Sequence, residues 1–435
     1  MLKITFMGAG STVFAKNVLG DCLVSPDLKG LEIALYDIDG ERLADSKVML
    51  QAINRKYASK AKIKTYLGTA NRKKALSGAD FVVNAIQVGG YEPCTVTDFE
   101  IPKKYGLRQT IADTLGIGGI FRALRTIPVV LDFIHDMEAV CPNALFINYT
   151  NPMAMITGAI QRVSSVKSVG LCHSVQACVP GLMGQLGMEY DETVQYKIAG
   201  INHQAWLLEV SKNGVDLYPE IKRRSLEQGA PDYDRVRHEM MHKFGYYITE
   251  SSEHTAEYLP YFIKNTHPEL IERFNIPLDE YPRRCVAQIA DWKQRRALLV
   301  SESKLEHVRT HEYASYIIES MLYNRVYKLG GNVLNHGLIT NLPQDACVEV
   351  PCLIDASGIQ PVVVGDLPPQ LAALNRTNIN PQLLTIEAAL TGKKEYIYHA
   401  AMLDPHTAAE LTMDEIVAMC DELIEAHGSW LPAYK

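Results

Sequence analysis

The sequence predicts an α/β protein with a doubly wound parallel sheet in its N-terminal part and an α+β domain after it. Two features of the chain point to this fold class. Short apolar runs alternate with longer segments of helical periodicity over roughly the first 195 residues, and the runs end near Gly, Asn or Pro, as buried strands do. Strands that alternate with helices pair in parallel, because each helix carries the chain back to the same edge of the sheet.

The expected strands of the N-terminal part are short and apolar, and the expected helices are longer. We predict strands at residues 2–7, 31–36, 81–86, 145–149 and 169–172. We predict helices at residues 17–23, 40–57 and 120–140. Doubly wound sheets bind ligands at the carboxyl ends of their strands, so the residues that directly follow these strands are candidates for a functional site.

The pattern changes near residue 195. Segments rich in Glu, Lys and Tyr favour helices at residues 231–322, 371–398 and 413–427, whereas residues 337–369 favour short strands and loops. The sequence therefore predicts two domains, one of residues 1–195 and one of residues 196–435, with the last helices free to pack back onto the first domain.

Composition and charge exclude several classes of protein. A content of 47% hydrophobic and 21% charged residues is ordinary for a globular chain, and a net charge of −7 argues against nucleic acid as a partner. No apolar run is long enough to span a membrane, and the first residues lack the pattern of a signal peptide. The nine cysteines are scattered without a C-x-x-C pair, which favours free thiols and a cytoplasmic location.

A glycine turn follows the first predicted strand. Gly8 and Gly10, with Ser11 opening the next helix, are typical of a site where a pyrophosphate approaches the backbone, although Val13 replaces the usual third glycine. Asp37 ends the second strand, where a carboxylate would bind ribose hydroxyls. Because that carboxylate would repel a 2′-phosphate, these four residues predict a Rossmann-like site for NAD rather than NADP.

A thiol and an imidazole stand out in the middle of the chain. Cys172 ends the strand of residues 169–172, and His203 follows about thirty residues later in the stretch AGINH. A thiolate and a neutral imidazole together suit a borderline divalent metal and leave positions open for substrate oxygens. On spacing alone, a core cysteine and a structural histidine remain the competing interpretation.

The whole chain resembles glycoside hydrolase family 4, and within it most closely the melibiase (α-galactosidase) branch. The resemblance rests on motifs in order along the chain: KITFMGAGST, ALYDID, VGGYEPCTVTDFE, IADTLGIGGIFRALRTIP, NYTNPMA, GLCHS, AGINH, TESSEH, NLP with VEVP, and HAAMLDPHTA. It implies a fold of the lactate and malate dehydrogenase superfamily. It also implies that the C-terminal domain binds substrate and forms a homodimer or homotetramer.

The family's chemistry explains why a hydrolase would need a redox cofactor. By resemblance, NAD+ accepts hydride from C3 of the sugar, a base removes the C2 proton, the aglycone leaves C1, and water adds before the hydride returns. Mn2+ or another divalent transition metal stabilises the oxygens at C2 and C3. Cys172 and His203 match the metal ligands of the family, and both then lie beside the substrate.

Sequence differences within the family indicate the substrate. Phospho-specific members have Asn or Asp after the metal-binding cysteine, whereas this chain has His173, a candidate acid for the leaving group. Arginines that would hold a 6-phosphate are missing around Val88, where Gln87 and Glu92 stand instead. A neutral α-galactoside is therefore expected. An α-galacturonide, an α-glucoside or, outside the family, a 2-hydroxy acid dehydrogenase reaction remain alternatives.

Several further residues have predicted roles. Asn151 matches the Asn-Pro turn of lactate and malate dehydrogenases and is expected beside the sugar or the nicotinamide, unless it only ends a strand. Arg122 and Arg125 share a helical face, as site residues or as structural ion-pair partners. The C2 base is expected within TESSEHTAEY, which contains four candidates. They are Glu250, Glu253, His254 and Tyr258, with Tyr258 and Glu250 favoured.

Overall fold

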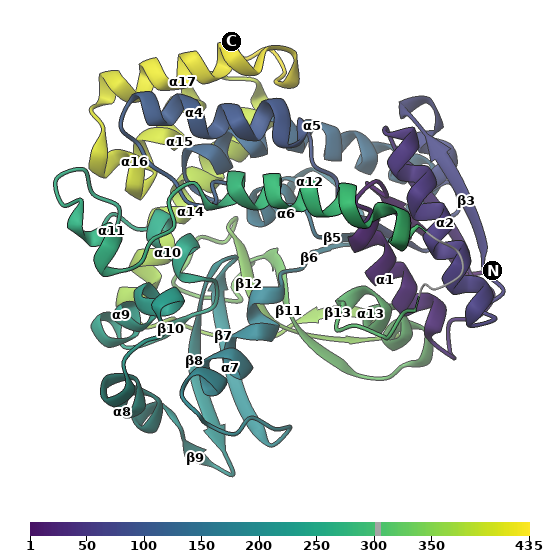
Figure 1. Cartoon of the computed structure of the whole chain (residues 1–435), viewed down its shortest axis with the longest axis horizontal. Helices are drawn as coiled ribbons and strands as arrows, with labels where there is room; N and C mark the ends of the chain where they lie inside the picture. Colours follow the sequence, from purple (N-terminus) through teal and green to yellow (C-terminus); the bar gives the residue numbers. More distant parts are fainter. Residues whose placement is uncertain (301–305) are drawn as a thin grey trace.

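The computed structural model describes residues 1–300 and 306–435 and contains a doubly wound parallel sheet, which confirms the predicted fold class (Figure 1). The parallel strands run in the order β3-β2-β1-β4-β5-β6. This is the order of dinucleotide-binding domains. The strands are β1 (Lys3–Met7), β2 (Glu32–Asp37), β3 (Lys62–Leu67), β4 (Phe81–Asn84), β5 (Leu145–Asn148) and β6 (Ser168–Gly170).

Helices cover both faces of this parallel half. Alternate residues of the central strand β1 point to opposite faces, so Ile4 and Phe6 join one core while Met7 joins the other. The first core includes α1 (Thr12–Val24), α2 (Gly40–Lys56) and α13 (Tyr313–Tyr323). The second includes α3 (Arg72–Leu76), α5 (Gly116–Val140) and α6 (Met153–Val163). With both faces covered, all five residues of β1 are buried, Lys3 and Thr5 included.

Antiparallel strands continue the same sheet beyond β6. In the described part of the chain the order runs on through β11 (Tyr327–Leu334), β12 (Cys347–Asp355), β7 (Val194–Ile201), β8 (Gln204–Lys212) and β10 (Tyr247–Ile248). Two short strands extend this half, β9 (Val215–Asp216) beside β8 and β13 (Gly358–Pro361) beside β12. The sheet thus crosses the predicted domain boundary at residue 195 without a break, and that boundary stays a prediction.

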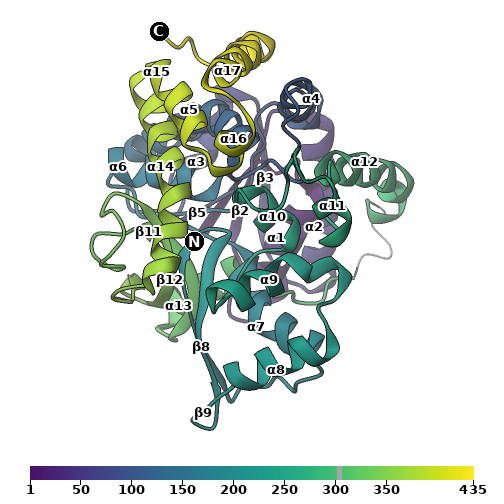
Figure 2. The same ribbon diagram turned by 90° about the vertical axis from the view of Figure 1, so that its left-hand side faces the viewer.

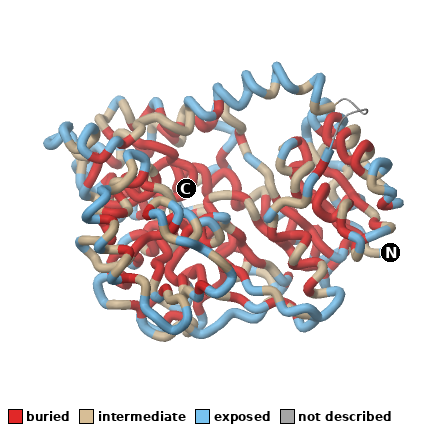
Figure 3. The backbone as a smooth tube through the Cα atoms, turned by 60° about the horizontal axis from the view of Figure 1, so that its bottom comes forward, coloured by how far each residue is buried: buried red, intermediate tan, exposed pale blue. Residues whose placement is uncertain are grey.

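The remaining helices surround the antiparallel half or return to the parallel half. They are α4 (Val96–Lys104), α7 (His173–Gln185), α8 (Tyr218–Gln228), α9 (Arg235–Phe244), α10 (Ser252–Tyr258), α11 (Glu269–Arg273), α12 (Glu280–Leu299), α14 (Pro369–Thr391), α15 (Glu395–Leu403), α16 (Pro405–Glu410) and α17 (Met413–His427). Helices α15 and α17 share a core with α5, so the C-terminal end packs against the N-terminal half (Figure 2). By contrast, α12 is exposed along most of its length (Figure 3).

Some element boundaries differ from the sequence prediction for identifiable reasons. Helix α1 starts at Thr12, directly after the glycine turn, rather than at residue 17. The edge strand β3 was not predicted, because its alternating polar residues are partly exposed. The predicted helix 371–398 is two helices separated at Gly392, whose left-handed conformation ends α14. Residues 301–305 of the predicted helical region lie outside the described residues.

No helix in the described part of the chain combines the length and hydrophobicity needed to cross a lipid bilayer. All nine cysteines lie in described residues and are free thiols, and eight of them are buried. Cys172 is partly exposed.

A buried ion pair fastens the C-terminal helix to the N-terminal half. The guanidinium of Arg125 in α5 donates to both carboxylate oxygens of Asp98 in α4, at 2.6 and 3.2 Å. His427, at the end of α17, donates its Nε2–H to the same carboxylate at 2.9 Å. Arg125 also donates to the backbone oxygen of Val88 at 3.1 Å, so this arginine is a structural ion-pair partner.

Replacing Arg125 with Met should therefore destabilise the protein strongly. The variant leaves Asp98 charged and buried, which costs about 3–5 kcal/mol. Urea unfolding measures this loss. The matched control is Arg223→Met, because Arg223 pairs with Glu220 and Glu227 on the exposed surface of α8, where ion pairs contribute about 0–1 kcal/mol. Equal losses in the two variants would contradict the structural role of Arg125.

Candidate active site

The glycine turn brings the backbone of β1 close to its neighbours. Gly8 has φ +86°, and a Cβ atom there would lie 2.7 Å from the backbone oxygen of Ala85. A Cβ atom on Gly10 would lie 2.8 Å from a carboxylate oxygen of Asp37, to which the Gly10 N–H donates at 2.5 Å. Both positions therefore require glycine, and the turn places Asp37 beside the start of α1.

The N-terminus of α1 suits a phosphate. Ser11 is its N-cap residue but forms no capping hydrogen bond through its side chain, and the first turn contains no acidic residue. Amide N–H groups at such a helix start attract anions. Val13, which replaces the third glycine, is 50% exposed. These features, with the narrow glycine turn, fit the pyrophosphate of a dinucleotide.

Three donor groups from separate loops meet at the carboxyl ends of the strands. Cys172 lies two residues beyond β6 as the N-cap of α7, and His203 occupies the tight turn between β7 and β8 with φ +63°. Glu250, which follows β10, places Oε2 3.9 Å from Cys172 Sγ and 3.5 Å from His203 Nε2. The three donor atoms lie within 4.8 Å of one another.

The chemistry of this group fits a divalent transition metal. Burial raises the pKa of the Cys172 thiol well above its usual value, and the negative charges of Glu250 and Glu349 raise it further. A bound cation is therefore needed to keep this side chain as a thiolate. Burial lowers the pKa of His203, which keeps the imidazole neutral and able to bind a metal. Thiolate, imidazole and carboxylate together suit Mn, Fe, Co or Zn.

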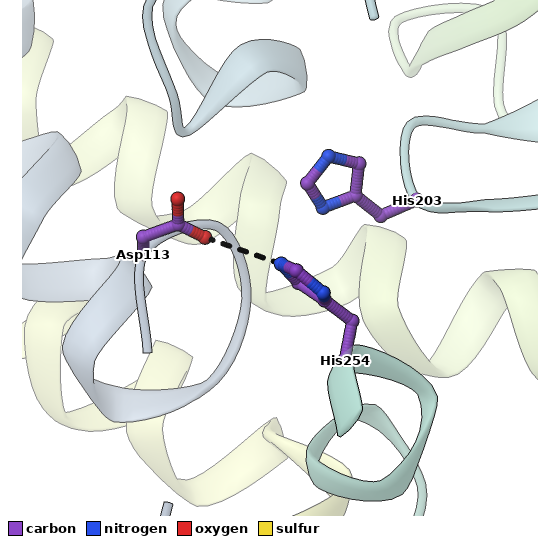
Figure 4. A group of neighbouring side chains, drawn as sticks. All are labelled: Asp113, His203 and His254. Atoms are coloured by element: carbon purple, nitrogen blue, oxygen red, sulfur yellow. Dashed lines mark ion pairs between the residues drawn. The ribbon is translucent and has the colours of Figure 1, made fainter. Parts of the chain in front are cut away.

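A second group of acidic and basic side chains adjoins the first (Figure 4). Asp113 and His254 lie with His203 in a cluster whose donor atoms are within 4.8 Å of one another, and Asp113 Oδ1 is 3.8 Å from His254 Nε2. Burial works against a charged His254, but Glu250 and Asp113 outweigh it and raise its pKa to about 9. Asn151 donates its side-chain amide to Asp113 at 3.3 Å, which places Asn151 in this cluster.

Glu257 holds the loop that carries Asp113. Its buried carboxylate accepts three backbone N–H bonds of 2.8–3.1 Å from residues 110–112. Ala112 has φ +52°, a strained conformation for a residue with a Cβ atom. Sequence reasoning assigned no role to Asp113 or Glu257. The motif IADTLGIGG contained the one signal, because Asp113 is the only charged residue in it, but its distance from His254 in sequence hid the contact.

The four candidates for the C2 base occupy different positions. Tyr258 is fully buried, and its hydroxyl is 2.9 Å from His203 Nδ1, so it fixes the ring that presents Nε2 to Glu250. His254 belongs to the second cluster. Glu253 instead pairs with Arg284 of α12 at 2.5 Å and contacts neither cluster in the described structure.

The other predicted site residues are not members of these two clusters in the described structure. The side chain of His173, the first residue of α7, is half exposed. Arg122 is buried, and its guanidinium lies 5.8 Å from the ring centre of Tyr281. Burial raises the pKa of Asp113, but His254 and Arg122 outweigh this effect, so the pKa of Asp113 is lowered. Gln87 and Glu92 are exposed. The roles predicted for individual site residues stay predictions.

Comparison with known proteins identifies the class of the chain. Residues 3–188 match the family described as Family 4 glycosyl hydrolase, and residues 198–407 match the Family 4 glycosyl hydrolase C-terminal domain. The chain is therefore a member of glycosyl hydrolase family 4, as its motifs predicted.

Individual relatives agree with this assignment. An α-galactosidase of Bacillus subtilis is 62% identical over 436 residues, with 100% of both chains covered. A crystal structure of a putative glucosidase from Bacillus subtilis superposes with a TM-score of 0.87 at 25% identity, covering 97% of this chain and 99% of that one. A 6-phospho-β-glucosidase of Thermotoga maritima, solved with manganese, NAD+ and glucose-6-phosphate, has a TM-score of 0.80 at 22% identity, covering 99% and 100%.

Substitution of Gly8 tests the geometry of the glycine turn. Gly8→Ala adds both left-handed strain and a contact with the Ala85 carbonyl, whereas Gly78→Ala adds strain alone, because nothing lies within 4 Å of a Cβ atom at Gly78. Left-handed strain costs about 1–2 kcal/mol, and the added overlap costs a further ~1–3 kcal/mol. Chemical denaturation should show Gly8→Ala to be the less stable variant, and equal stabilities would contradict the close approach.

Proposed function

We propose that the protein is an α-galactosidase that uses NAD and a divalent metal, with Mn2+ as the first candidate, to cleave melibiose-like galactosides. The observation that carries this proposal is the meeting of Cys172, His203 and Glu250 at the sheet edge that also holds the glycine turn. A plain glycosidase with two carboxylates needs neither feature. Full-length likeness to an α-galactosidase at 62% identity supports the galactoside among the substrates of the family.

Separate groups of residues bind the dinucleotide and the metal. Gly8 and Gly10 admit the pyrophosphate of NAD, Ser11 opens the helix that faces it, and Asp37 accepts hydrogen bonds from the adenosine ribose. Cys172 and His203 hold the cation, with Glu250 beside them, and leave positions for the sugar hydroxyls at C2 and C3. When bound, NAD+ accepts hydride from C3 reversibly and the cation stabilises negative charge on the two oxygens.

Side chains must carry out two proton transfers, removal of the proton from C2 and protonation of the oxygen that leaves C1. Oxidation at C3 acidifies the proton at C2, and a base must remove it. Glu250 suits this task better than Tyr258, because His203 and His254 outweigh its burial and lower its pKa. The Tyr258 hydroxyl is engaged with His203 instead, and burial raises its pKa well above the usual value. His173 then donates a proton to the oxygen that leaves C1.

Other predicted features belong to the same proposal. Asn151 and the pair Asp113–His254, which adjoin His203, contact the sugar beside the metal ligands. Free thiols throughout the chain suit a reducing cytoplasm. A homodimer or homotetramer, expected from the family, stays a prediction.

Cofactor dependence tests the proposed function directly. Hydrolysis of p-nitrophenyl α-galactoside should be lost when NAD+, Mn2+ or reductant is omitted from protein stripped of retained cofactor. Cys172→Ser should abolish activity, whereas Cys178→Ala, which removes a buried thiol elsewhere in α7, should retain it. Indifference to all three omissions would overturn the proposal. Faster hydrolysis of the α-galacturonide or α-glucoside would assign that sugar as the substrate instead. Accumulation of NADH with turnover would indicate a dehydrogenase.

Isotope exchange separates the two candidate bases. In heavy water, deuterium should enter C2 of the released galactose, because the base exchanges its proton with solvent. Glu250→Gln should reduce this exchange by about 10²–10⁴-fold, the range for general base catalysis. Tyr258→Phe should retain exchange but weaken Mn2+ binding, measured by electron paramagnetic resonance, because His203 loses its partner. The reverse pattern would assign the base to Tyr258.

A further inference from the structure

Three side chains distant in sequence hold the imidazole of His173. Its ring lies between those of Tyr149 and Tyr313, with ring centres 6.0 and 5.9 Å away and interplanar angles of 28° and 26°. Its Nε2 atom is 2.8 Å from Oε2 of Glu312. The His173 side chain is 53% exposed, but that of Glu312 is only 13% exposed. A ring enclosed in this way has a fixed orientation although one edge faces solvent.

The carboxylate of Glu312 is itself fixed by the segment that carries it. Thr310, two residues earlier, donates its backbone N–H and its hydroxyl to Asp21 at 2.8 and 2.6 Å. His307 donates to the same buried carboxylate at 2.7 Å. Asp21 belongs to α1, the helix that begins at the glycine turn. The segment before Glu312 is therefore anchored on the helix of the proposed cofactor site.

The residues after Glu312 are anchored on the proposed metal site. Tyr313 donates its hydroxyl to the backbone oxygen of Cys172 at 3.1 Å. Ala314 donates its N–H to the hydroxyl of Tyr149 at 3.1 Å. Three consecutive residues at the start of α13 thus contact Tyr149, Cys172 and His173. No sequence motif singled out this segment, and the site as described above does not use it.

We infer that Glu312 is a positioning residue that fixes the orientation and the tautomer of His173. The inference rests on the proposed function, in which His173 protonates the leaving group. A carboxylate facing Nε2 keeps a proton on that nitrogen, so Nδ1 is the atom that exchanges a proton with the substrate. An orienting carboxylate of this kind serves the histidine of a catalytic triad.

The proton balance of the step is then defined. As the bond between C1 and the aglycone oxygen breaks, its electron pair goes to that oxygen, which takes the proton from Nδ1. The imidazole is left neutral, with its Nε2–H donated to Glu312. When water adds to C1, its hydroxyl bonds to carbon and its remaining proton returns to Nδ1. The ring thereby recovers its starting state within one turnover.

Two substrates with different leaving groups distinguish positioning from a structural role. Melibiose releases a sugar alkoxide that needs a proton, whereas p-nitrophenyl α-galactoside releases a stable phenolate that does not. Glu312→Gln should lower kcat/KM for melibiose by about 10–100-fold, less than the roughly 10²–10⁴-fold that complete loss of general acid catalysis costs. It should change kcat/KM for p-nitrophenyl α-galactoside by less than about threefold. The matched control is Glu306→Gln in the same segment, which removes an exposed carboxylate paired with Lys56 and should change neither substrate.

A double-mutant cycle with His173→Ala shows whether Glu312 acts through the ring. In the His173→Ala background, Glu312→Gln should have no further effect on melibiose. Binding of NAD+ and Mn2+ and the thermal midpoint should match those of the parent in each variant, which separates a loss of positioning from a loss of fold.

Four results would overturn the inference alone, and a fifth would overturn the proposed function with it. Equal slowing of both substrates by Glu312→Gln would indicate a structural role, and unchanged melibiose hydrolysis would remove any role. A full additional loss in the His173→Ala background would show that Glu312 acts elsewhere. If His173→Ala slows both substrates alike or neither, His173 is not the acid and the inference fails while the galactosidase activity stands. A wild-type protein that hydrolyses neither galactoside would instead overturn the proposed function together with the inference.

Discussion

The site depends on the backbone pairing that connects the parallel half of the sheet to the antiparallel half. Across it, Gly170 of β6 pairs with Asn332 of β11, Asn332 with Glu349 of β12, and Glu349 with Gly200 of β7. One line of residues therefore crosses four strands. Cys172 follows the first of these strands and His203 the last, and the turns after these two strands bring thiol and imidazole within 4.8 Å of each other. The buried Glu349, which accepts a hydrogen bond from Asn332, sits within this line, and burial raises its pKa to about 8.

Charge compensation allows so many ionisable groups to be buried together. Asp113, Glu250 and His254 are each costly to bury alone, but each stabilises the charged form of a neighbour. The arrangement leaves His203 neutral between them, as metal binding requires. Glu257 contributes from outside the clusters, since its bonds to three amides keep Asp113 in place.

The chain passes between the two halves of the molecule several times, and each passage adds a part of the site. The parallel half supplies the glycine turn, the Asp113 loop and Cys172, and the antiparallel half supplies His203 and Glu250. The segment before α13 then returns to α1 and brings Glu312 to His173. Because hydrogen bonds tie this segment to both α1 and His173, movement of one half relative to the other would displace Asp21, Glu312 and His173 together.

The sequence by itself determined the parallel half of the fold except its edge strand β3, the glycine turn with Asp37, and the family. These follow from local periodicity, from backbone conformations that only glycine tolerates, and from motifs that stand in order along the chain. Only the tertiary structure decided that the antiparallel strands extend the same sheet, that Glu250 joins Cys172 and His203, and that Asp113, Glu257 and Glu312 lie beside the predicted site residues or hold the loops around them. Such contacts join residues up to 162 positions apart. They depend on how strands register and loops close, and no local pattern in the sequence records those distances.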